Sequence, residues 1–198
     1  MKADLKIPDL SDLSKVSLYF TTHRTFFASG PESYAQYALV ANYIRLVDLA
    51  VAEYQDGRER AFRYWEPSES LALSAMIRAS GYFEDCLSNV KRAINHLKVI
   101  RSYKDFPQDL KDTLPRQLKV LRGDAEKKIT NIRDAIQHLE KDVENLNVKQ
   151  GNPICLMLEF ERLMLGDYSI SYQEISEWLK ELHRCATNIH GYYLKIRP

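Results

Sequence analysis

The chain has 198 residues, a length typical of one domain, and its 28 Lys and Arg residues nearly balance its 27 Asp and Glu residues. A hydrophobic share of 45% with 28% charged residues is typical of a folded globular protein and excludes wholesale disorder. Seven Gly and seven Pro residues argue against a turn-rich all-β sandwich, and a net charge of +1 provides no global attraction to nucleic acid or membrane.

The cysteines and the apolar segments indicate where the protein works. Cys86, Cys155 and Cys185 lie far apart and form no CxxC pair, which favours a reducing compartment over a disulfide framework or a zinc site. The first twenty residues carry three aspartates and no continuous apolar core, unlike a signal peptide. The longest uncharged stretch, 33–44, is shorter than the roughly 18 residues that a spanning helix needs. We expect a cytoplasmic protein that does not enter a membrane.

Two regions are predicted from the apolar pattern. Residues 1–30 show no sustained period, and we expect a partly ordered N-terminal arm with one short helix after Pro8. Residues 31–198 should form a helical bundle domain. Its first helix is predicted over 32–55, because a Ser-Gly-Pro-Glu start precedes apolar residues at steps of four and three. Asp56-Gly57 should end this helix, since glycine readily adopts the left-handed conformation found after helices.

The second and third helices follow the same period. The second is predicted to begin near 67–70 and to end near Tyr103, with Ser80-Gly81 as a soft spot that permits a close helix contact or a slight bend. Residues 104–115, which contain two prolines, should form a connection with room for one helical turn. The third helix has the most regular apolar stripe, from Leu118 to Leu146 at steps of three or four.

The last part of the chain predicts a small sheet and a fourth helix. After a break at 151–153, apolar segments at 154–160 and 163–171 indicate a β-hairpin, with either the residues between them or Gly166-Asp167 as its turn. Ser171 precedes the fourth helix. Because each helix must bury one apolar stripe, the sequence predicts an all-α fold, an up-and-down four-helix bundle with a small β-hairpin between helices three and four.

Several catalytic motifs are absent from the sequence. It contains neither GxxxxGK[ST] nor GxGxxG, so phosphate-binding loops of the common types are excluded. It also lacks HExxH, Glu-x-x-His and GxSxG, which argues against a metalloenzyme and a serine hydrolase. We therefore expect a protein that uses no cofactor and no metal.

One segment of the third predicted helix combines polar residues, Arg133-Asp134-Ala135-Ile136-Gln137-His138. An arginine, a polar residue and, after four intervening positions, a histidine resemble the motif of the HEPN superfamily of helical-bundle ribonucleases. The resemblance extends over the bundle, about 32–196, although only these residues are specific. It implies an all-α core, a two-fold dimer and metal-independent cleavage of RNA. Arg133 and His138 match the catalytic pair, and Asp134 matches the polar position after the arginine.

These residue types suit cleavage of RNA without a metal. The reaction needs a base for the ribose 2′-hydroxyl, an acid for the leaving oxygen and positive charge near the phosphorane. Histidine titrates near neutral pH, and arginine stays charged and matches phosphate oxygens in geometry. Asp134 precedes His138 by four residues, so on a helix it can orient the imidazole.

The spacing of the motif also predicts a dimer. Five residues on a straight helix correspond to about 140° of rotation and about 7.5 Å of rise, so one Arg133–His138 pair meets a single phosphate poorly. A two-fold axis beside the third helix would add the residues of a second copy, and a local break in the helix would also help. We expect a homodimeric endoribonuclease for single-stranded RNA, acting as a toxin or in defence or stress. The alternative is a catalytically inactive bundle that binds a protein or a nucleotide.

Two further observations qualify the resemblance. Arg184 and His190 form a second match, but Cys185 occupies the polar position, so we prefer the first. In family members that are silenced by nucleotide addition, a tyrosine stands two residues after the motif histidine, where this chain has Glu140. That form of control is not expected, although an antitoxin or a nucleotidyltransferase remains a candidate partner.

Basic and aromatic clusters offer additional contacts for RNA, although each charge also suits a solvated surface. The first cluster belongs to the third helix and its approach: Arg116, Lys119, Arg122, Lys127, Lys128 and Arg133. The second belongs to the second helix: Lys91, Arg92, Lys98 and Arg101. Aromatic residues alternate with arginines between 54 and 65, where bases can stack; packing against the end of the bundle is the alternative.

Overall fold

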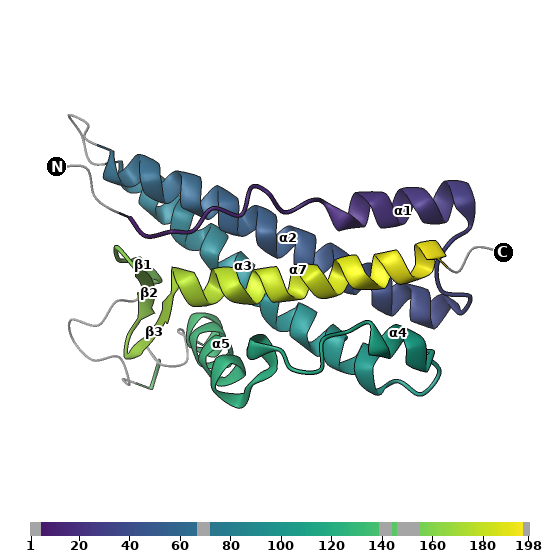
Figure 1. Ribbon diagram of the computed structural model, residues 1–198. Coiled ribbons are helices and arrows are strands. Elements are labelled where there is room, and N and C mark those ends of the chain that lie inside the picture. Colours follow the sequence, from purple (N-terminus) through teal and green to yellow (C-terminus); the bar gives the residue numbers. More distant parts are fainter. Residues whose placement is uncertain (1–4, 67–71, 139–143, 146–154, 196–198) are drawn as a thin grey trace.

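The protein is mostly helical, with one small sheet at one end (Figure 1). The computed structural model describes residues 5–66, 72–138, 144–145 and 155–195. Three long helices lie side by side and share the core: α2 (Tyr34–Trp65), α3 (Leu73–Ser102) and α7 (Tyr172–Lys195). No helix in the described part of the chain is both long and apolar enough to cross a bilayer.

The N-terminal arm is more ordered than the sequence predicted. Residues before the helix run along the bundle and bury Leu5, Ile7 and Leu10, and the predicted short helix is α1 (Val16–Phe27). Two carboxylate oxygens of Asp48 in α2 accept the backbone N–H groups of Val16 and Ser17, at 3.2 and 2.7 Å. Because this cap comes from a distant part of the chain, the local sequence gave no sign of where α1 begins.

Helix α2 continues ten residues beyond its predicted end, so the prediction that Asp56-Gly57 ends it was wrong. Gly57 lies inside α2 and faces the buried ring of Phe83 in α3, where a Cβ atom would be 3.2 Å from ring carbons. Gly81, the predicted soft spot, has open space around it. The glycine that permits the close approach of two helices is therefore Gly57.

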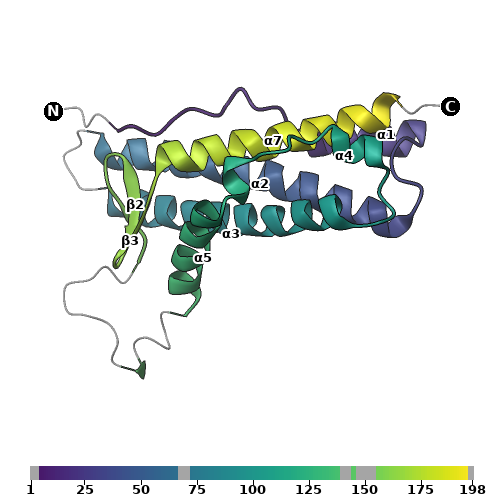
Figure 2. The same cartoon turned by 60° about the horizontal axis from the view of Figure 1, so that its bottom comes forward.

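The third predicted helix is shorter and differently placed than expected. A single 3₁₀ turn, η1 (Lys119–Leu121), precedes α5 (Gly123–Gln137), and Leu139 and Leu146 of the predicted stripe lie outside the described residues. Helix α5 buries three residues, Ala125, Ile129 and Ile132. It lies across the long helices rather than alongside them, and its C-terminal end points away from them (Figure 2). The predicted helical turn of the preceding connection is present as α4 (Gln108–Asp112).

The predicted hairpin is a three-stranded antiparallel sheet in the order β1-β2-β3. Its strands are β1 (Met157–Leu158), β2 (Arg162–Leu165) and β3 (Tyr168–Ser171). Both of the alternative turns occur, which adds the extra strand. Gly166 opens the two-residue turn with a φ of 57°, a conformation that such hairpin loops require and glycine adopts freely. Buried Leu163 pairs with buried Ile170, so one face of the sheet joins the core.

Candidate functional site

The motif residues lie at the C-terminal end of α5. Arg133 lies just before its last turn, Asp134 begins that turn, and His138 is the first residue after the helix, with φ −117° and ψ 13°. The backbone N–H of His138 still donates to the carbonyl oxygen of Asp134, at 2.9 Å. The helix therefore ends at the motif histidine. Because this hydrogen bond keeps the Cα atom of His138 on the helical path, His138 and Arg133 still point in different directions around the helix axis.

The carboxylate of Asp134 contacts the arginine of the motif. Its Oδ1 lies 3.3 Å from Nη1 of Arg133, and the two side chains are 31% and 47% exposed. Within the described residues, the imidazole of His138 makes no hydrogen bond and is exposed to solvent. The predicted contact between the Asp134 carboxylate and the His138 imidazole is therefore absent in the described structure, and the side chains of Arg133, Asp134 and His138 all reach solvent.

Most lysines of the predicted basic clusters hold α5 and η1 in place. Lys91 and Lys98 of α3 both bind Glu126 of α5, at 2.9 and 2.5 Å, and lower the pKa of its carboxyl. Lys128 of α5 binds Glu174 of α7 at 2.5 Å. These charges are neutralised within the chain. In the described part, the exposed members without an ion pair are Arg92, Arg116, Arg122 and Lys127.

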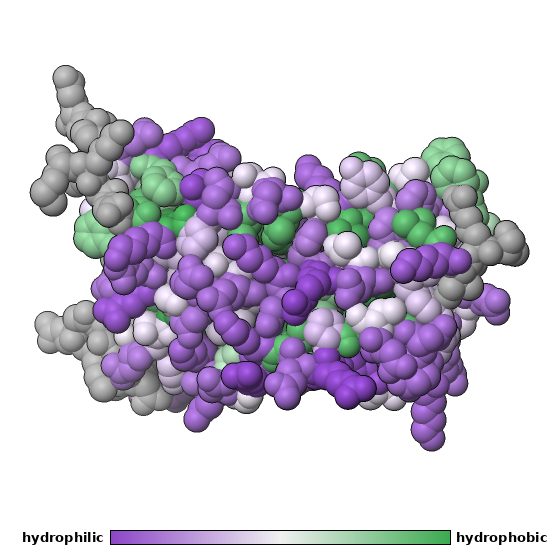
Figure 3. Space-filling model, viewed as in Figure 1, coloured by the Kyte–Doolittle hydropathy of each residue, from purple (hydrophilic) through white to green (hydrophobic). Residues whose placement is uncertain are grey.

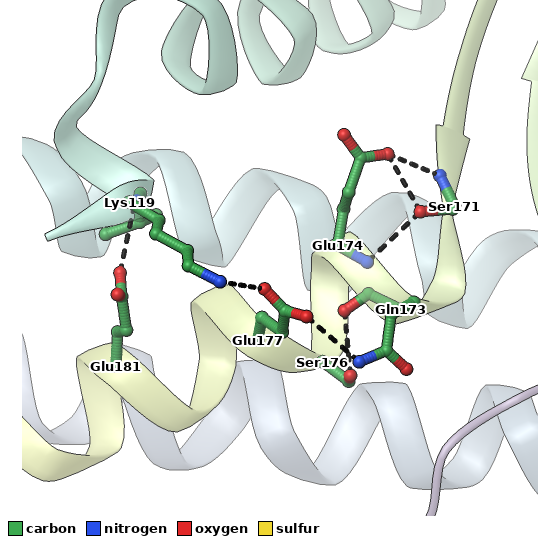
Figure 4. A network of polar contacts seen from close by, with 8 residues as sticks. Lys119, Ser171, Gln173, Glu174, Ser176, Glu177 and Glu181 are labelled. Atoms are coloured by element: carbon green, nitrogen blue, oxygen red, sulfur yellow. Dashed lines mark hydrogen bonds and ion pairs between the residues drawn. The ribbon is translucent and has the colours of Figure 1, made fainter.

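The start of α7 fixes the region from which α5 departs (Figure 4). The hydroxyl of Ser171 accepts the backbone N–H of Glu174 at 3.1 Å, and the Glu174 carboxylate accepts the Ser171 N–H at 3.0 Å, as in a capping box. One turn further, Glu177 binds Lys119 at 2.7 Å, and Glu181 accepts the backbone N–H of the next residue of η1 at 3.0 Å. The last strand, η1 and α7 are thus joined to one another, and all but α7 contact α5 through several residues.

The second match to the motif is part of a contact between helices. His190 of α7 is half-buried, and its Nε2 lies 2.9 Å from Nδ1 of His23 in α1. The two ring planes differ by 19°, with Phe20 edge-on to His190. Burial, and then His23, lower the pKa of His190. This pair attaches α1 to α7, while Arg184 is exposed.

The aromatic stretch is divided between the core and the surface. Tyr54 is buried and its hydroxyl donates to the carbonyl oxygen of Tyr172 at 3.4 Å. The Arg58 guanidinium lies 4.8 Å from the ring centroid of Phe62, and its Nε donates to a carbonyl of the N-terminal arm. Packing accounts for these residues, as the alternative predicted. Trp65, at the end of α2, contacts the sheet instead.

Comparison with known proteins adds one partial similarity. No family model matches the chain, and no solved structure matches it. The chain is 30% identical over 99 residues to "Spectrin beta chain, erythrocytic" of Mus musculus. This similarity covers 48% of this chain and 5% of the spectrin chain, so it carries no activity or partner over to this protein.

Proposed function

We propose that the protein is a metal-independent endoribonuclease of the HEPN type that cleaves single-stranded RNA as a homodimer. The observation that supports this most is the place of Arg133 and His138, on the exposed end of a helix that points away from the long helices (Figure 2). A second copy or a strand of RNA can approach this end. A two-fold axis beside it would bring two arginines and two histidines into one cleft.

Each residue has a distinct part in the proposed reaction. His138 exchanges protons with the 2′-hydroxyl and the leaving 5′-oxygen, because imidazole titrates near neutral pH. Arg133 binds the phosphate oxygens and stabilises the negative charge that grows on them. Asp134, whose carboxylate contacts Arg133, is a positioning residue for the guanidinium rather than for the imidazole. Attack of the 2′-oxygen on phosphorus then leaves a 2′,3′-cyclic phosphate and a free 5′-hydroxyl.

Cleavage of a labelled RNA in EDTA tests the proposal. The wild-type protein should cut a single-stranded substrate, and His138→Ala and Arg133→Ala should each abolish cutting without changing the circular dichroism spectrum. His96→Ala is the matched control, because the His96 ring bonds only to a carbonyl of its own helix in the described structure. The control should cut like the wild type. Equal cleavage by the wild type and the two site variants would refute the proposal.

One observation favours the alternative, a catalytically inactive module that binds a partner such as an antitoxin. Helix α1 exposes an apolar surface on one side, with Leu18 and Phe26 61% and 75% exposed. If the wild type fails to cut RNA but binds a candidate antitoxin, and Phe26→Asp abolishes that binding, the binding module is the better description. RNA cleavage by the purified chain would exclude it.

A further inference from the structure

A surface cavity of about 560 Å³ lies where the end of α2 meets the turn between β1 and β2. Its volume is in the range of small-ligand sites. Figure 3 shows apolar side chains at this end of the molecule beside a largely hydrophilic surface. The cavity is lined by Trp65, Leu158, Glu159, Phe160, Glu161 and Arg162.

Aromatic rings form one wall of the cavity. The ring centroids of Trp65 and Phe160 are 4.8 Å apart, and Phe160 is 48% exposed. Tyr64 packs edge-on against Trp65 at 5.0 Å. Within the described residues, the indole N–H of Trp65 has no hydrogen-bond partner, so packing against the core and the neighbouring rings holds the indole. Phe160 is exposed beside the partly buried Trp65, and an aromatic surface of this kind suits the stacking of a nucleobase.

The polar edge of the cavity combines two carboxylates and one guanidinium. Arg162 Nε lies 2.7 Å from the Glu159 carboxylate, and Glu161 pairs with Lys6. Each of these side chains is 45% exposed or more, so a ligand can exchange with these ion pairs at little cost. The pairing with Lys6 lowers the pKa of Glu161, which keeps that carboxylate ionised and able only to accept hydrogen bonds.

This set of groups matches one base better than the others. Guanine presents two neighbouring donors, N1–H and the exocyclic amine, which a carboxylate accepts together. Its O6 and N7 are acceptors that suit a guanidinium. Adenine presents an unprotonated N1 in place of the first donor, and a carboxylate repels it. A purine also offers more stacking surface than a pyrimidine.

We propose that the cavity beside Trp65 and Phe160 binds an unpaired guanine base of single-stranded RNA. The inference rests on the proposed function, because it names the feature of the substrate that the nuclease would hold. Helix α5 packs against β2 and β3, so the sheet that carries Arg162 also supports the helix that carries Arg133 and ends before His138. Both lie at the same end of the molecule (Figures 1 and 2).

Tryptophan fluorescence tests the binding step apart from cleavage. GMP, IMP and AMP are titrated into the wild-type protein, which has two tryptophans: Trp65 at the cavity and Trp178, which is 4% exposed. GMP should quench the fluorescence, IMP should bind more weakly because it lacks the exocyclic amine, and AMP should bind at least tenfold more weakly than GMP. Trp65→Phe should remove the GMP-dependent change and keep the Trp178 signal. Absence of quenching, or equal affinity for GMP and AMP, would overturn the inference.

Variants of the polar edge provide a second test, in which calorimetry measures the affinity for GMP without relying on tryptophan fluorescence. Glu159→Gln and Glu161→Gln remove one negative charge each, and at least one should weaken GMP binding tenfold or more. Glu32→Gln, at the opposite end of the bundle, is the matched control and should bind GMP like the wild type. Unchanged affinity in both cavity variants would overturn the inference. His138→Ala should bind GMP normally. A wild type that binds GMP but does not cleave RNA refutes only the proposed function, and a wild type that cleaves RNA but does not bind GMP refutes only this site.

Discussion

The imidazole of His23 in α1 hydrogen-bonds to the imidazole of His190 in α7, with 2.9 Å between Nδ1 and Nε2. One nitrogen donates and the other accepts, so the bond tolerates one added proton. A second proton places hydrogens on both facing nitrogens and breaks the bond. The attachment of α1 to the bundle should therefore depend on pH.

The direction of this dependence follows from the lowered pKa of His190. Because the pKa in the folded chain lies below the unfolded value of about 6.5, the unfolded chain binds more protons as the pH falls. The stabilisation that neutral His190 contributes is thus fully present above about pH 6.5, and it is lost as the pH falls through the pKa of His190 in the folded chain. Thermal unfolding at about pH 7.5 and about pH 5 should show a smaller decrease in Tm for His190→Gln than for the wild type. His96→Gln is the control, and equal decreases in all three proteins would contradict the assignment.

Gly57 and Gly81 form a matched pair of helical glycines. Gly57→Ala should destabilise the protein by about 1–3 kcal/mol, because its Cβ would lie 3.2 Å from the buried ring of Phe83, and this overpacking outweighs the better helix propensity of alanine. Gly81→Ala meets open space and should stabilise the protein by up to about 1 kcal/mol. Urea unfolding measures both. A stabilising Gly57→Ala would show that the Phe83 ring shifts enough to admit the added methyl group, against this prediction.

The capping box of α7 gives a third prediction. Ser171→Ala removes the acceptor for the backbone N–H of Glu174 and should cost about 1 kcal/mol of stability. Thr187→Ala is the control, since its hydroxyl donates to a carbonyl of the same helix and its loss should change the stability by less than about 0.5 kcal/mol. Equal effects of the two substitutions in urea unfolding would argue against the cap.

The carboxylate of Asp48 in α2 caps the start of α1 and should stabilise it. Asp48→Ala removes the acceptors for the backbone N–H groups of Val16 and Ser17, so α1 should open more often. Hydrogen exchange followed by mass spectrometry should show faster exchange over 16–27 and unchanged exchange in the middle of α3. Uniformly faster exchange would indicate general destabilisation instead.

Local patterns predicted the elements whose ends are fixed by neighbouring residues. The Ser171–Glu174 box marks the start of α7, and the apolar stripes of α2, α3 and α7 lie in the core as expected. The end of α2 was missed because local rules treat Gly57 as a residue that ends a helix. In the structure Gly57 lies inside α2, where its lack of a side chain makes room for the ring of Phe83. The start of α1 was missed because its capping carboxylate is 31–32 residues away.

The sequence pattern selects the residues of the candidate site but does not predict their arrangement. The spacing of Arg133 and His138 carries no information on where α5 ends, and that end is what exposes His138. Helical geometry favoured Asp134 with His138, yet the carboxylate turns to its sequence neighbour Arg133. The contact between His23 and His190 joins residues 167 positions apart, which no local pattern predicts.

The most direct test of the central claim is RNA cleavage by a mixture of two inactive variants. Arg133→Ala and His138→Ala chains are unfolded together, refolded and assayed in EDTA on single-stranded RNA. If the proposed dimer forms, the intact arginine of one copy and the intact histidine of the other would share a cleft in mixed dimers, so the mixture should recover a clear fraction of wild-type cleavage. A mixture as inactive as either variant, beside an active wild type, would show that the two copies do not complete one site. A wild-type protein that leaves the RNA intact would contradict the proposal that the protein is a ribonuclease.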